Sequence, residues 1–126
     1  MTETEANIRR SILDTLRFLS SEAEQRTFAS KVFYRSYQGE FACWWFDTFY
    51  PEDPSAHAMF SSHEFAVLKA FSLAFDQQLS AIGLGDIDIE QLLARPEWKL
   101  VIASAHDARA KLQHIINGNQ KSIENQ

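Results

Sequence analysis

The sequence predicts an all-α protein, folded as a single-domain bundle of five or six helices. Apolar side chains recur every three or four residues through most of the chain, which is the period of one helix face. Two segments begin with a Ser-x-x-Glu signature, the capping box that starts many helices. A length of 126 residues suits one domain. The four glycines and three prolines fit the starts and ends of these periodic segments.

The first expected helix covers residues 5–20. Its large apolar side chains share one face, so the helix is amphipathic and should pack against a core. These side chains are Ile8, Ile12, Leu16 and Leu19.

The second expected helix begins at Ser21 and runs to about Tyr37. Ser21 should cap its first turn, with the glutamate three residues later reaching back to the backbone of Ser21. Phe28 and Val32 should be buried, and Gly39 should end the helix.

An aromatic and acidic stretch follows. Residues 37–54, YQGEFACWWFDTFYPEDP, hold seven aromatic and four acidic side chains and neither Lys nor Arg. Phe41, Trp45 and Phe49 are spaced by four, which favours a helix to about Phe49. A buried strand stays open as an alternative, because aromatic residues also favour sheets. The two prolines that follow predict a loop.

The clearest local signal is FSSHEF at residues 60–65. Ser61 is a good N-cap, Glu64 is its capping-box partner, and the two phenylalanines take the positions of a hydrophobic staple. The helix that follows should end at Gly83 and Gly85.

Two more helices complete the bundle. Asp88 and Gln91 frame a short helix, IEQLLA. Pro96 suits the first turn of the last helix, and Gly118 should close it. We expect a frayed tail over about 119–126.

Negative charge is concentrated in the middle of the chain. The net charge is −5, but residues 40–97 alone carry two Lys/Arg and ten Asp/Glu, a balance of −8. Residues 1–39 and 98–126 carry +1 and +2. Such a field repels nucleic acid and attracts basic partners. The alternative is a solvated surface that only aids solubility.

Cysteine content and the N-terminus favour a cytoplasmic protein. A single cysteine excludes an intramolecular disulfide, which favours a reducing compartment. The N-terminal MTETEANIRR lacks the apolar core of a signal peptide, and no apolar run is long enough to span a bilayer. We therefore expect no membrane partner.

No motif predicts a cofactor or a catalytic centre. The four histidines lack the three- or four-residue spacing that places two metal ligands on one helix face, so no metal is expected. Cys43 has no base beside it in the sequence and should be a buried, inert thiol. One enzymatic alternative stays open, with an unknown reaction carried by a cluster around the proline loop. Its members would be Asp53, His57, His63 and Glu64.

The aromatic and acidic stretch predicts a protein-binding surface. Tryptophan and tyrosine are favoured in interfaces, and carboxylates attract a basic partner. The residues expected to contact the partner are Glu40, Trp44, Asp47, Tyr50, Glu52 and Asp53. Two alternatives remain: the aromatic residues fill the core of a small bundle, or exposed aromatics let the protein self-associate.

The same region resembles a known kind of protein. The order Gly39-Glu40-Phe41, Trp45-Phe46-Asp47, Tyr50-Pro51-Glu52 and Phe60-Ser61, with Glu64, Leu68 and Phe71, is similar to small α-helical bacterial toxin-immunity proteins. The resemblance spans about residues 39–75. It implies a protein that binds and blocks a cognate toxin domain made by the same cell. Acidic immunity proteins match the basic surface that a nuclease toxin presents to its substrate.

Overall fold

The chain folds into an all-α domain, as the sequence predicts. The computed structural model describes the backbone of residues 1–124 and the side chains of residues 1–118. Within these residues there are seven helices, one or two more than expected. They are α1 (Glu3–Leu19), α2 (Glu22–Lys31), α3 (Tyr37–Phe46), α4 (Pro54–Met59), α5 (Ser62–Ile82), α6 (Ile89–Ala94) and α7 (Pro96–Glu124).

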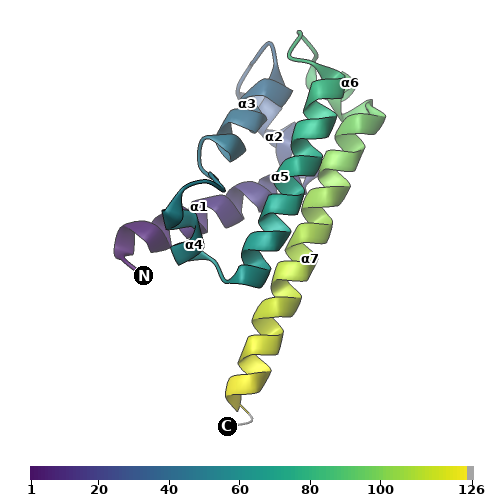
Figure 1. The fold of residues 1–126 in the computed structure, drawn as a ribbon. Coiled ribbons are helices and arrows are strands. Elements are labelled where there is room, and N and C mark those ends of the chain that lie inside the picture. The colour runs from purple at the N-terminus through teal and green to yellow at the C-terminus, as the bar shows by residue number, and fades with distance from the viewer. Residues whose placement is uncertain (125–126) are drawn as a thin grey trace.

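The two longest helices form the spine of the fold. Figure 1 shows α5 and α7 side by side and antiparallel, with α1 crossing them and the short helices α3 and α4 beside α5. The last turns of α7 extend beyond the start of α5. None of the helices in residues 1–124 has both the length and the apolar character needed to cross a membrane.

The predicted aromatic stripe of α3 is confirmed as core. Phe41, Trp45 and Phe49 are at most 1% exposed, although α3 itself ends at Phe46. The indole N–H of Trp45 donates to the Ser72 hydroxyl of α5 at 2.7 Å. The helical alternative is therefore correct for this stretch, and burying each ring contributes roughly 2–3 kcal/mol.

The expected course of the second helix is wrong. α2 ends at Lys31, and the next residue, Val32, is extended and 37% exposed rather than buried. Gly39 does not end a helix; it lies in the first turn of α3, where its N–H donates to the hydroxyl of the N-cap Ser36. A Cβ on Gly39 would lie 2.9 Å from that hydroxyl. Glycine is therefore needed for close approach beneath the cap.

The expected loop after α3 contains a short helix. Asp53 is the N-cap of α4, and its carboxylate accepts the Ser55 N–H at 2.9 Å. Pro54 takes the first helical position, where its missing N–H costs nothing. Proline here starts a helix instead of preventing one.

The expected end of the last helix is also wrong. α7 continues through Gly118 to Glu124. Within the expected frayed tail, the side chains of residues 119–126 and the backbone of 125–126 lie outside the described residues.

Candidate protein-binding surface

The six residues expected to bind a partner lie on α3, on the loop that follows and at the start of α4. Four of them are exposed, namely Asp47, Tyr50, Glu52 and Asp53. Glu40 and Trp44 are half-buried. The structure groups four of these residues into two neighbouring depressions that share Asp47, and it places Trp44 and Glu52 in neither.

The first depression, which we call the α3 groove, lies between α3 and the C-terminal end of α5. Its volume is about 520 Å³. Glu40, Cys43 and Asp47 line it from α3, together with the N-cap residue Ser36 and the half-buried helix residue Gly39. Its apolar walls are Tyr34, Ala42, Phe46, Leu79 and Leu84.

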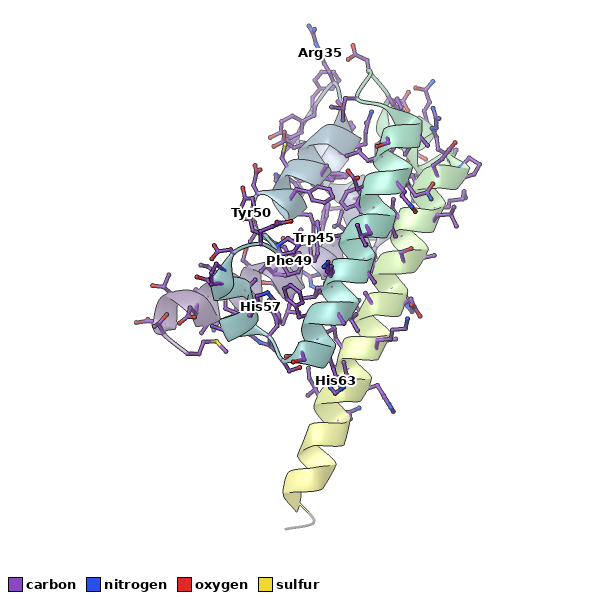
Figure 2. The ribbon with its side chains drawn as sticks, in the orientation of Figure 1. Arg35, Trp45, Phe49, Tyr50, His57 and His63 are labelled. Carbon is purple, nitrogen blue, oxygen red and sulfur yellow. The ribbon has the colours of Figure 1, made fainter. Side chains whose placement is uncertain are left out.

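The second depression, which we call the loop pocket, has a volume of about 290 Å³. Asp47, Tyr50 and Asp53 line it, above the apolar side chains of Ile8 and Ile12 from α1. Tyr50 is 51% exposed and lies at the edge of the fold, outside the buried pair Trp45 and Phe49 (Figure 2).

Asp47 is the residue whose position the fold explains least. It is the C-cap of α3, and the last turn of α3 carries no basic side chain. Backbone carbonyls give this end of a helix a partial negative charge, so a carboxylate here is unfavourable. Among the described side chains, Asp47 forms no ion pair. Its charge therefore does not serve the stability of α3.

The other three carboxylates, unlike Asp47, do not lie at an unfavourable helix end. Glu40 lies in the first turn of α3, where negative charge is favourable, and Asp53 caps α4. Glu52 is an exposed loop residue. None of the three forms an ion pair with a described Lys, Arg or His side chain. All four are thus available to a basic partner.

Trp44 belongs to an aromatic cluster between α1, α2 and α3. Its ring centroid lies 5.3 Å from that of Phe18, 5.0 Å from Phe28 and 5.2 Å from Phe41. Its remaining exposed edge faces α1 in a shallow pocket with Arg10. Trp44 and Tyr50 therefore do not lie in one pocket.

Three of the four residues of the catalytic alternative, Asp53, His57 and Glu64, serve structural roles, and His63 is exposed. Arg9 donates to Glu64 at 2.8 Å, and the Ser61 N–H donates to the same carboxylate at 2.9 Å. Burial alone would raise the pKa of Glu64, but these hydrogen bonds and the charge of Arg9 outweigh it and lower the pKa. His57 stacks on Phe65, with ring centroids 4.1 Å apart.

His57 and His63 lie on different helices, α4 and α5 (Figure 2). No three His, Cys, Asp or Glu side chains within the described part of the chain gather as metal ligands.

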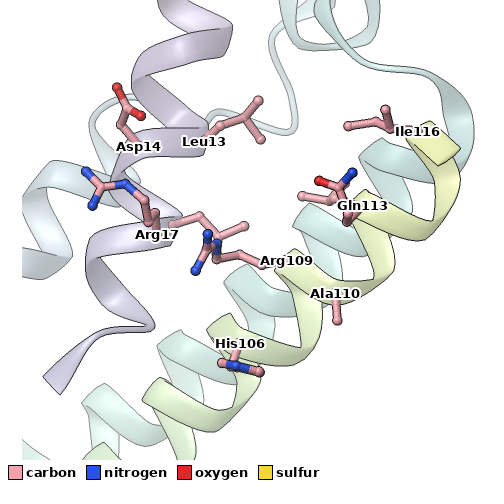
Figure 3. A pocket seen from close by; sticks show the side chains of 10 residues that line it. Leu13, Asp14, Arg17, His106, Arg109, Ala110, Gln113 and Ile116 are labelled. Carbon is pink, nitrogen blue, oxygen red and sulfur yellow. The ribbon is translucent and has the colours of Figure 1, made fainter.

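A further pocket, of about 460 Å³, lies between α1 and α7 and is lined by two arginines and by the carboxylate of Asp14. Figure 3 shows Arg17, His106 and Arg109 around it. Both guanidinium groups already have partners, because Arg17 pairs with Glu24 and Arg109 donates to the Ser20 hydroxyl at 3.2 Å. The four acidic side chains of residues 40–53 lie instead on the α3–α4 side of the fold.

Sequence reasoning missed two components of the α3 groove. Cys43 is exposed, so the expectation of a buried thiol is wrong; on α3 it lies between the buried Ala42 and the half-buried Trp44. Leu84 is 65% exposed on the groove rim. A leucine between two glycines, in Gly83-Leu84-Gly85, is the signal that could have identified it, because a turn presents such a side chain outward.

Comparison of the chain with protein-family models, with curated proteins and with solved structures gave no match.

Proposed function

We propose that this protein is an immunity protein that binds a cognate toxin domain, a basic nuclease, and blocks it. The observation that carries the proposal is the exposed and unpaired carboxylate of Asp47 at the unfavourable end of α3. Residues kept at a cost in stability often serve function. Asp47 borders both depressions, so one partner surface can contact the α3 groove and the loop pocket together.

The chemistry of the surface suits a basic protein partner. Glu40, Asp47, Glu52 and Asp53 supply negative charge, and Tyr50 supplies an exposed aromatic ring. Charges of this kind mainly speed association, whereas aromatic contacts mainly slow dissociation. Such a protein would act in the cytoplasm, before the toxin leaves the cell that makes it. The enzymatic alternative is weaker because Glu64 and His57 are occupied in the fold.

The test is co-expression with the toxin domain encoded beside this gene. The wild-type protein should restore growth and bind the purified domain. The variant Asp47→Lys, Glu52→Lys, Asp53→Asn should associate at least about tenfold more slowly at low salt and less so at high salt. Asparagine at 53 keeps the N-cap, so α4 should survive.

Asp14 carries an exposed carboxylate on α1. The variant Asp14→Asn is therefore the matched control and should behave as the wild type does. Failure of the wild type to protect cells from the adjacent toxin would refute the proposal.

Self-association is the second candidate, and one observation favours it. Phe33 is 81% exposed on the extended segment between α2 and α3. Exposed aromatic side chains of this size mark contact surfaces when they join a larger apolar patch. Sedimentation across a wide concentration range separates the two candidates, because a dimer should be lost in Phe33→Ser and an immunity protein should be unaffected.

A further inference from the structure

The α3 groove combines apolar walls with two carboxylates, Glu40 and Asp47. Glu40 and Asp47 are seven residues apart, which is two turns and about 10 Å along the helix. The apolar walls of the groove include Phe46, Leu79 and Leu84, and Leu84 lies beside Gly39. A complementary partner must therefore offer two cations about 10 Å apart with an apolar group between them.

An α-helix matches this spacing better than an extended strand. Positions i and i+7 of a helix share one face and are about 10.5 Å apart. On a strand, residues of one face are about 6.8 Å or 13.6 Å apart, so neither spacing fits. Positions i+3 and i+4 of the helix fall between the two cations and would face the apolar walls.

The rim of the groove is held in place before any partner arrives. The fully buried amide of Gln38 donates to the carbonyl of Gly83 at 3.1 Å and to that of Gly85 at 2.8 Å. These two bonds fix the backbone on either side of Leu84, and the side chain of Leu84 is exposed. A preformed rim lowers the entropy lost on binding.

We propose that the α3 groove binds a helix of the partner that carries Lys or Arg at i and i+7 and apolar side chains at i+3 and i+4. The inference rests on the proposed function for its claim that the partner is a basic protein. Glu40 and Asp47 pair with the two cations, and the apolar side chains enter between Phe46 and Leu84.

Cys43 provides the readout, because it is the only cysteine in the chain, is exposed and lines the groove. The rate at which its thiol reacts with Ellman's reagent would be measured with a synthetic, end-capped helical peptide. The peptide carries Arg at i and i+7 with Leu and Phe between them. A matched peptide of the same composition carries Arg at i and i+5, which lie on different faces. The first peptide should slow the reaction about tenfold at saturation and bind at least about tenfold more tightly than the second.

Variants of the protein test whether the peptide binds in the α3 groove. Glu40→Gln with Asp47→Asn should weaken the first peptide about tenfold or more, and Asp14→Asn should not change its binding. Circular dichroism of each variant checks that the fold is kept. Equal binding of both peptides, or no protection of Cys43, would overturn the proposal. Protection that rises with protein concentration alone, with dimers in sedimentation, would also overturn it, because the groove would then hold a second copy.

The peptide-binding experiment and the toxin-neutralisation experiment can give different results. If the Glu40→Gln, Asp47→Asn protein still neutralises the adjacent toxin at the wild-type rate, the groove inference fails and the immunity function stands. If the peptide binds as expected and no toxin is neutralised, the groove inference stands and the immunity function fails.

Discussion

The indole N–H of Trp98 in α7 donates to the side-chain oxygen of Gln25 in α2 at 2.9 Å, and both side chains are fully buried. The amide nitrogen of Gln25 donates in turn to the carbonyls of Phe18 and Leu19 at 3.2 and 3.1 Å. These carbonyls belong to the last turn of α1, whose C=O groups lack partners within the helix. One glutamine thus joins three helices through satisfied buried bonds.

Gln25→Leu should therefore destabilise the protein by about 2–4 kcal/mol, because it leaves the Trp98 N–H and the Leu19 carbonyl buried without partners, whereas the Phe18 carbonyl still accepts from the Ser21 N–H. Urea unfolding followed by circular dichroism measures the loss. Gln78→Leu, at a half-buried position of α5 for which no side-chain hydrogen bond is found in the described residues, is the control. A loss below about 1 kcal/mol for Gln25→Leu would show that water replaces the missing bonds.

Neutralising the two ends of α3 should change stability in opposite directions. Asp47→Asn removes negative charge from the C-terminal end and should stabilise the protein by about 0.3–1 kcal/mol. Glu40→Gln removes favourable charge from the first turn and should destabilise it by a similar amount. Denaturant midpoints at low and high salt test both, since salt should shrink both effects. Destabilisation by Asp47→Asn would contradict the view that its charge is unfavourable in the free protein.

Glu64 should make stability depend on acid. Its pKa is lowered below the usual value of 4.5 in the folded protein, so the folded state binds its proton less readily than the unfolded state. The stability from this group is therefore fully present above about pH 5 and is lost as the pH falls below 4.5. Glu64→Gln should cost about 1 kcal/mol at pH 7 and progressively less towards pH 3. A constant difference between the two proteins across this range would refute the role of the Arg9–Glu64 pair.

Trp44→Ala should lower stability by about 2–3 kcal/mol, because the ring contacts Phe18, Phe28 and Phe41. Trp44→Phe keeps part of these contacts and should cost less. Thermal and urea melts measure both variants. If Trp44→Ala melts as the wild type does, the Trp44 ring is not needed for stability and is free to contact a partner. A partner that dissociates more slowly from the wild type than from Trp44→Ala would then assign the ring to the interface.

Much of the fold could be predicted from local patterns. The capping box of Ser61 and Glu64 forms as expected, because its two hydrogen bonds lie within four residues of sequence. The four-residue spacing places the rings of Phe41 and Trp45 on one buried side of α3, and Phe49, just beyond the end of the helix, is buried next to Trp45. Local chemistry of this kind does not depend on the rest of the chain.

The errors arise where a short polar residue overrides an apolar pattern. Asp53 starts a helix that the apolar periodicity does not reveal, since α4 is only six residues long. The aromatic spacing does predict α3, but not its start at the N-cap Ser36, within a segment that the sequence assigned to the preceding helix. The burial of Gln25 and Gln38 was also invisible in the sequence, because each glutamine bonds to carbonyls or an indole supplied by distant segments. Cys43 is exposed because it lies two residues from both Phe41 and Trp45 and so faces away from the buried side of α3.

Arg9 of α1 holds the C-terminal end of α4 in place. Its guanidinium group donates to the Met59 carbonyl at 2.9 Å and lies over the Phe60 ring. Residues 47–58 therefore form a segment between two fixed points, the last turn of α3 and this contact. Only Phe49 and Ala56 anchor that segment in the core. Opening it exposes far less apolar surface than separating α5 from α7, so its amides should exchange with deuterium through a local fluctuation. The segment that carries Asp47, Glu52 and Asp53 can therefore open while α5 and α7 stay packed.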